Sequence, residues 1–266
     1  MTPERPADTP GAKPLGVRAT VGAAWSVVRR HPRETILPAL VVQTPVALII
    51  SVVVVAFYFT GLRHEQNVAP QEVLDHGGRG AQFLVAATAA AQGLFGQVAR
   101  AASILGIAGV HTGRPLRLVE ALDPAFTRMG TLLALAIAFG LLLFGLAATV
   151  VLLPLALYLA LRLALAFEFC IIEKRGVGAS LAGSWRLLRG SLLRFALGAI
   201  VLAATLIGPF AVISLLNLAV AGGRDTEVIL YGITSFVTNV LVTPLVTVIT
   251  AYTTISYLKL KGATSG

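Results

Sequence analysis

The stretch that decides the fold is Met129–Leu161, MGTLLALAIAFGLLLFGLAATVVLLPLALYLAL, which holds no Asp, Glu, Lys, Arg or His in 33 residues. Thr35–Leu62, Phe195–Gly223 and Val228–Leu258 share this property, and a shorter stretch of the same kind covers residues 80–99. A helix needs roughly 20 mostly apolar residues to cross the hydrocarbon core of a bilayer. Helices of soluble folds usually keep a polar face, so they do not exclude charge over such lengths. The sequence therefore predicts an all-α integral membrane protein.

The composition of the whole chain agrees with this prediction. Hydrophobic residues make up 56% of the chain and charged residues 12%, against about 25% charged residues in soluble domains. The net charge of +9 does not indicate nucleic-acid binding, because the basic residues flank the apolar stretches in ones and twos and form no basic groove with interleaved aromatics. The single cysteine, Cys170, lies in an apolar run. One cysteine makes neither a disulfide framework nor a thiolate metal site.

This pattern predicts a short N-terminal segment followed by one membrane domain. Residues 1–16 contain four prolines and little apolar side chain, so we expect a disordered lead-in. Residues 17–260 form the membrane domain. Its six predicted spans cover residues 36–60, 82–109, 130–151, 154–172, 193–221 and 228–257.

The third and fourth spans need an internal turn. The apolar run from Met129 to Ile172 is 44 residues long, which as one helix would be a rod of about 66 Å, twice the thickness of the hydrocarbon core. Proline cannot continue the hydrogen-bond ladder of a helix. We therefore expect a transmembrane hairpin with its turn at Pro154.

Basic residues are distributed unevenly between the two sides of the predicted membrane domain. The side that carries both termini has 16 basic and 6 acidic residues, whereas the other side has 3 basic and 5 acidic ones. Lys and Arg are enriched in cytoplasmic segments. Both termini are therefore predicted to be cytoplasmic.

A short segment that ends in an aromatic residue precedes the first, third and fifth spans. The three segments are 17–25, 118–126 and 177–185, and their apolar residues recur at a helical period. A helix with basic residues opposite apolar ones, and with a terminal Trp, is typical of the membrane interface. We therefore predict three repeats, each an interfacial amphipathic helix followed by a transmembrane hairpin, with these interfacial residues: Trp25, Arg29, Arg30, Trp185, Arg186 and Arg189.

Residues 173–191, EKRGVGASLAGSWRLLRGS, resemble a segment of bacterial six-span membrane proteins. That group includes the membrane domain attached to some glycerophosphoryl diester phosphodiesterases, together with uncharacterised relatives. Arg162, the Thr243-Pro244-Leu245 break and the closing Tyr257, Lys259 and Lys261 fit the same resemblance. It implies the six-span architecture and a bacterial cytoplasmic membrane. It implies no activity, because the catalytic part of those enzymes is a separate soluble barrel.

Three charged residues lie inside the predicted spans: Arg100, Arg162 and Glu168. A charge at mid-membrane costs about 2.5–3.5 kcal/mol on insertion scales, so such residues normally face the bundle and have a partner. Arg100 shares a helical face with small residues and is expected to point into the protein. A structural Arg100–Glu168 ion pair, an anion or lipid-headgroup site, and independent arginines that extend to the interface all remain open.

Polar residues also recur along one face of the last span. Asn239, Thr243, Thr247, Thr250 and Thr254 fall at offsets of 0, 4, 8, 11 and 15. Threonines in membrane helices often bond to their own backbone and relieve proline kinks. A stripe that lines a hydrated path is the alternative.

No catalytic constellation is present: the sequence lacks a phosphate-binding loop, a zinc-binding His pair and a nucleophile elbow. We therefore predict a non-enzymatic membrane protein without metal or cofactor. Its expected partners are the phospholipid bilayer, anionic lipid and a membrane-protein partner. The alternative is a small transporter or exporter component with a site between the repeats, near Arg100 and Arg162.

Overall fold

The computed structural model describes residues 16–57, 78–147, 152–220 and 225–264, and these residues contain no β-strand. The predicted lead-in, residues 1–16, lies almost entirely outside the described residues. The helices are α1 (Val17–Arg30), α2 (Pro32–Thr35), α3 (Leu37–Phe57), α5 (Gly78–His111), α6 (Leu118–Thr127), α7 (Met129–Ala147), α8 (Leu153–Leu163), α9 (Ala166–Ile172), α10 (Val177–Leu187), α11 (Leu192–Val220) and α12 (Asp225–Thr264).

Six helical stretches among the described residues are long and apolar enough to cross a membrane. They are Leu37–Ala56, Gln82–His111, Met129–Leu146, Leu153–Ile172, Leu192–Leu215 and Gly232–Gly262. Each falls on one of the six stretches that the sequence predicts. The protein is therefore an all-α, multi-pass membrane protein.

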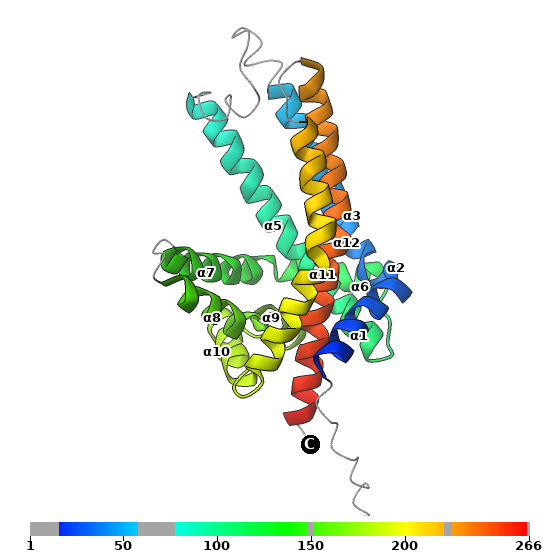
Figure 1. Cartoon of the computed structure of the whole chain (residues 1–266), viewed down its shortest axis with the longest axis vertical. Helices are drawn as coiled ribbons and strands as arrows, with labels where there is room; N and C mark the ends of the chain where they lie inside the picture. Colours follow the sequence, from blue (N-terminus) through cyan, green and yellow to red (C-terminus); the bar gives the residue numbers. More distant parts are fainter. Residues whose placement is uncertain (1–15, 58–77, 148–151, 221–224, 265–266) are drawn as a thin grey trace, which may run out of the picture.

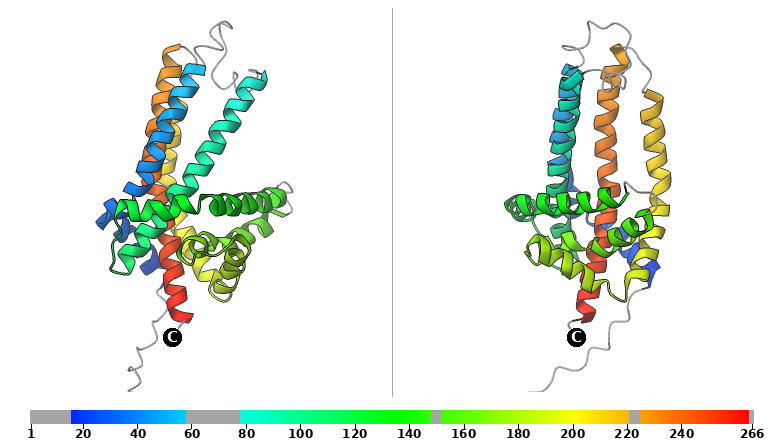
Figure 2. Two further views of the ribbon diagram at one scale, coloured as in Figure 1. Left: turned by 180° about the vertical axis from the view of Figure 1, so that it is seen from behind. Right: turned by 90° about the vertical axis from the view of Figure 1, so that its left-hand side faces the viewer.

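The six stretches do not all run in the same direction. Four long helices, α3, α5, α11 and α12, run along the long axis of the molecule, whereas α7 lies across that axis (Figures 1 and 2). The sequence predicts that α7 and the segment after it form a hairpin like the others. In the structure α7 is held across the bundle by its buried Leu132 and Leu135 and by an edge contact between the rings of Phe139 and Phe167, with centroids 6.4 Å apart.

The predicted fourth span consists of two helices, α8 and α9, with a break at Ala164–Leu165. The Ser184 hydroxyl on α10 fills the break: it donates to the carbonyl of Arg162 at 2.8 Å and accepts from the amide of Leu165 at 3.2 Å. A buried backbone group without a partner is costly in an apolar environment. Ser184 therefore makes the break tolerable. Pro154 lies in the first turn of α8, where proline fits a helix.

Helices also form at the three short segments before the first, third and fifth spans. These are α1, α6 and α10. None of the nine apolar residues aligned in these helices or directly after them is exposed: Val17, Val21, Val28, Leu118, Leu122, Met129, Val177, Leu181 and Leu188. Their equivalence as three repeats remains a prediction. The helices that follow them differ, because α3 and α11 run along the bundle while α7 crosses it (Figure 1).

The hydrophobic core has two parts, and α9 belongs to both. Leu165, just before α9, and Phe169 pack with residues of α1, α11 and α12, whereas Phe167 and Ile171 pack with residues of α3, α5, α6 and α7. Every residue from Ala166 to Ile171 is buried. A polar group on α9 therefore lies between the two parts of the core.

Candidate functional site

Glu168 is the polar group that α9 carries into the core, and its side chain is fully buried. The hydroxyl of Thr253 on α12 donates a hydrogen bond to its Oε1 atom at 2.5 Å. Its Oε2 atom is buried and has no hydrogen-bond partner in the described part of the chain. Burying a charged group without a full set of partners costs free energy. The Glu168 side chain is therefore buried with only one of its two carboxyl oxygens in a hydrogen bond.

Arg100 of α5 lies in the neighbourhood of Glu168, because it lines the same cavity as Thr253, which bonds to Glu168. No salt bridge joins the two charges among the described residues. The guanidinium instead lies over the ring of Phe167, 4.2 Å from the centroid. An ion pair between these two charges across helices is one of the alternatives that the sequence leaves open. The structure brings them into one neighbourhood without direct contact.

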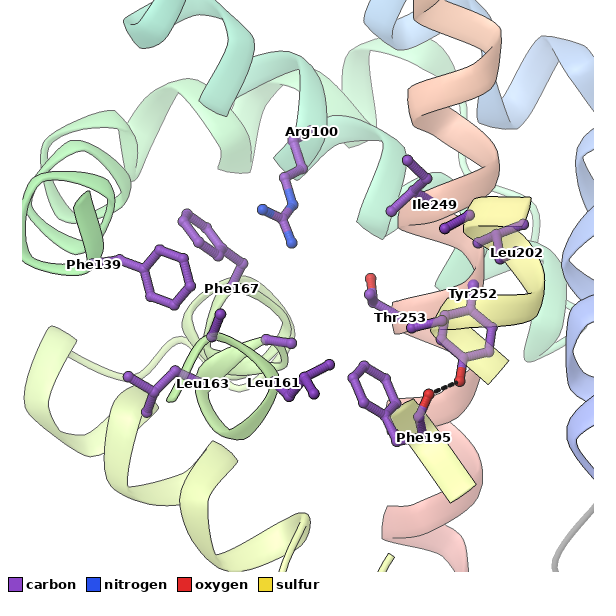
Figure 3. Close-up of a pocket in the computed structure, with 14 residues that line it drawn as sticks. Arg100, Phe139, Leu161, Leu163, Phe167, Phe195, Leu202, Ile249, Tyr252 and Thr253 are labelled. Carbon is purple, nitrogen blue, oxygen red and sulfur yellow. Dashed lines mark hydrogen bonds between the residues drawn. The ribbon is translucent and has the colours of Figure 1, made fainter. Parts of the chain in front are cut away.

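Arg100 faces a cavity of about 320 Å³ where α5, α7, α8, α9, α11 and α12 come together. Figure 3 shows the guanidinium of Arg100 pointing into this space, with Phe139 and Phe167 on one side and Phe195 and Tyr252 on the other. The rest of the wall is mostly apolar and consists of Ala160, Leu161, Leu163, Ala164, Ala199, Leu202, Ala203, Ile249 and Thr253. Clefts of this size with few polar groups are typical of small-molecule sites.

Among the described residues, the guanidinium of Arg100 contacts the ring of Phe167 and forms neither a salt bridge nor a hydrogen bond. Arginine has five N–H donors in a fixed planar arrangement that matches carboxylate and phosphate groups. The face of α5 that carries Arg100 is packed only in part, because Ser103 is buried whereas Ala89 and Gly93 are exposed. The cavity therefore presents one cation with unused donors inside an apolar wall.

Arg162 does not line this cavity. Its guanidinium lies 5.0 Å from the ring centroid of Trp185 and 5.4 Å from that of Tyr158. It also donates to the Tyr158 hydroxyl at 2.9 Å and to the carbonyl of Trp185 at 3.3 Å. The predicted site near both arginines is thus separated: Arg100 faces the cavity, whereas Arg162 joins α8 to the end of α10.

The predicted interfacial residues Trp25, Arg29, Arg30, Trp185, Arg186 and Arg189 are all exposed. Trp185 is 40% exposed although its ring packs edge-on against Tyr158. On the opposite face of α1, Val21 and Val28 are buried. The arginines are therefore free to meet an anionic surface, which remains a prediction.

The polar stripe of the last predicted span is held mainly by its own helix. The hydroxyls of Thr243, Thr247 and Thr250 each donate to the carbonyl four residues earlier, and the side-chain amide of Asn239 does the same. Thr243 is also 2.6 Å from Oε1 of Gln43 on α3. Four members of the stripe therefore have partners on their own helix around Pro244, whereas the hydroxyl of Thr254 is buried without a hydrogen-bond partner among the described residues. Thr253, one position outside the stripe, bonds to Glu168.

A second charged cluster, around Glu173, was not predicted as a site. Glu173 lies 2.6 Å from Lys261 and 2.5 Å from Arg175, and it accepts a hydrogen bond from Tyr257. Burial alone would raise the pKa of Glu173, but hydrogen bonds from Lys261 and Tyr257 and the two cations outweigh it and lower that pKa. The cluster ties the end of α12 to the turn after α9. The sequence signal for this cluster is the closing Tyr257 and Lys261, which fit the resemblance to the six-span proteins.

The described residues contain no group of three or more His, Cys, Asp or Glu side chains that would hold a metal ion. The chain matches no protein-family model, no curated protein and no solved structure. The function is therefore argued from the cavity and its charges.

Proposed function

We propose that this protein is a non-enzymatic membrane module that binds an anionic phospholipid, with the lipid phosphate at Arg100. The observation that carries the proposal is the position of the Arg100 guanidinium: it points into an apolar cavity and its donors have no protein acceptor in the described part of the chain (Figure 3). A phosphate accepts two parallel N–H bonds from one guanidinium. The apolar wall suits an acyl chain.

Phe167 supports this role of Arg100. Its ring lies under the guanidinium at 4.2 Å, and an aromatic face attracts a cation by about 0.5–2 kcal/mol, more strongly when water is excluded. The ring also leaves the N–H donors at the edge of the guanidinium plane unoccupied. A planar cation held in this way is oriented before the lipid arrives, which lowers the entropic cost of binding.

The surrounding bilayer supplies the ligand. We infer a bacterial cytoplasmic membrane and cytoplasmic termini from the basic residues and from the resemblance to the six-span proteins. Exposed arginines such as Arg29, Arg30 and Arg186 would then face anionic headgroups, each attracted by about 1 kcal/mol. These arginines would raise the local concentration of anionic lipid near the site.

Thermal unfolding in detergent tests the proposal. We expect dioctanoyl-phosphatidylglycerol to raise the Tm of the wild type, since a ligand at 100 times its Kd stabilises by about 2.7 kcal/mol. Arg100→Gln should abolish this rise. Arg114→Gln is the matched control, because it removes an exposed arginine of the turn between α5 and α6 and should leave the rise unchanged. An undiminished rise in Arg100→Gln, or an equal rise with dioctanoyl-phosphatidylcholine, would refute the proposal.

A carrier is the second candidate function. The buried Glu168 carboxylate beside the cavity favours it, because ionisable residues within membrane domains often mark ion or substrate pathways. Reconstitution into liposomes discriminates the two functions. A carrier moves fluorescent phosphatidylglycerol between leaflets in a manner that depends on Arg100, whereas a binding module leaves the leaflet distribution unchanged.

A further inference from the structure

Two pairs of alanines line the cavity in front of Arg100. One pair lies on α8 and directly after it, at Ala160 and Ala164, and the other lies on α11, at Ala199 and Ala203. Residues four apart share one face of a helix, so each of these neighbouring helices presents two methyl groups to the cavity. The space in front of Arg100 therefore depends on small side chains on both helices.

The cavity is open on one side. Ala203 and Ile249 are exposed, whereas Leu163, Phe195 and Tyr252, which also line the cavity, are buried. Both exposed residues belong to stretches that are long and apolar enough to cross a membrane. Exposed apolar residues of such stretches face the hydrocarbon of the bilayer. The mouth of the cavity, at Ala203 and Ile249, therefore faces lipid.

The inside of the cavity offers few polar partners to a ligand. Besides Arg100, the polar side chains of the wall are Tyr252 and Thr253. Tyr252 donates to the carbonyl of Phe195 at 2.6 Å, and Thr253 donates to the carboxyl group of Glu168 at 2.5 Å. A polar headgroup placed inside would lose its water without gaining partners. The space below the guanidinium, towards Leu161 and Phe195 in Figure 3, therefore suits a chain and not a headgroup.

The volume of the cavity fits one chain. A water molecule takes about 30 Å³ in the liquid and a methylene group is of similar size, so the cavity of about 320 Å³ has room for roughly ten methylene groups. We propose that one acyl chain of the anionic phospholipid enters this cavity sideways from the bilayer, through the mouth at Ala203 and Ile249, and that the four alanines determine whether it fits. The headgroup and the second chain stay at the mouth. This inference rests on the proposed function, because the phosphate at Arg100 anchors the chain.

Thermal unfolding of the purified full chain over a titration with dioctanoyl-phosphatidylglycerol tests the inference, because the dependence of the Tm on lipid concentration gives an apparent Kd. Ala203→Trp narrows the mouth, and Ala160→Leu fills the cavity from α8. Each variant should raise the Kd by about 5- to 150-fold, the range that corresponds to the cost of overpacking a core. Glycerol 3-phosphate, which carries a phosphate without a chain, should not raise the Tm of the wild type at the same concentrations.

Ala204→Trp is the matched control. Ala204 is exposed on α11 directly after Ala203 but does not line the cavity, so this variant should bind with the Kd of the wild type.

The outcomes separate the two proposals. A wild type that dioctanoyl-phosphatidylglycerol does not stabilise would overturn the proposed function and this inference with it. A wild type that is stabilised, with an unchanged Kd in Ala203→Trp and Ala160→Leu, would overturn the inference alone, and so would equal stabilisation by glycerol 3-phosphate. The two variants lie on different helices, so either one decides the matter if the other does not fold.

Discussion

Gly198 on α11 is the position at which a single methyl group should damage the wall of the cavity. A Cβ atom built there would meet the hydroxyl of Tyr252 and lie 2.8 Å from its Cζ and 2.9 Å from its Cε2. Tyr252 is 3% exposed and donates to the carbonyl of Phe195 at 2.6 Å. To relieve this clash the ring of Tyr252 must move away from α11, so Gly198→Ala should break this hydrogen bond.

The magnitude follows from three terms. Overpacking a core costs about 1–3 kcal/mol. A buried donor or acceptor that is left without its hydrogen-bond partner costs about 1–3 kcal/mol. Replacing glycine by alanine within a helix stabilises the helix by about 1 kcal/mol. We therefore expect a net loss of roughly 1–5 kcal/mol in the free energy of unfolding. At about 2–4 °C per kcal/mol for a chain of this size class, the Tm falls by several degrees or more.

Thermal unfolding of the purified protein in detergent is the assay. Gly140→Ala in α7 is the matched control, because no atom lies within 4 Å of the Cβ built there, and it should be neutral or slightly stabilising. Adding Tyr252→Phe to Gly198→Ala removes the atom in closest contact and should restore part of the loss. A Gly198→Ala protein as stable as the wild type would refute the packing of α11 on Tyr252.

Two further predictions concern the charged cluster and the topology. The lowered pKa of Glu173 means that its stabilising contribution is complete above the unfolded pKa of about 4.3 and is lost as pH falls through the lower folded value. By thermal unfolding, Glu173→Gln should therefore be less stable than the wild type at pH 7, and the difference should shrink as the pH is lowered below about 4. In a Cys170→Ser background, a cysteine at Gln71 should react with an impermeant thiol reagent on intact cells and one at Gly178 should not; labelling of Gly178→Cys from outside would contradict cytoplasmic termini.

The helices of this protein were predictable from sequence, because their physical cause is local. Charge-free stretches such as Phe195–Gly223 cannot be solvated along their length, so the bilayer requires them to be helical. The short helix α10 was predictable from the period of its apolar residues. Each of these signals depends on neighbours along the chain.

The arrangement of those helices was not predictable, because it depends on distant side chains. Nothing near Leu165 in the sequence marks a break; the backbone groups left open there bond to Ser184, which reaches them from another helix. The direction of α7 depends on where Phe139 meets Phe167. The charges Arg100 and Glu168 were identifiable as exceptions within apolar runs. Their separation from Arg162 follows only from the packing of Trp185 and Tyr158 around that arginine.

Photocrosslinking tests the central claim, lipid binding at Arg100, most directly. Phosphatidylglycerol with a diazirine on one acyl chain would be incorporated with the protein into nanodiscs, irradiated, and its adducts mapped by mass spectrometry. We predict adducts on the cavity wall, at residues such as Phe167, Leu202 and Ile249, which disappear in Arg100→Gln and persist in Arg114→Gln, which removes an exposed arginine outside the site. Adducts confined to the exposed outer residues Leu141 and Phe144 of α7, and unchanged by Arg100→Gln, would contradict the claim.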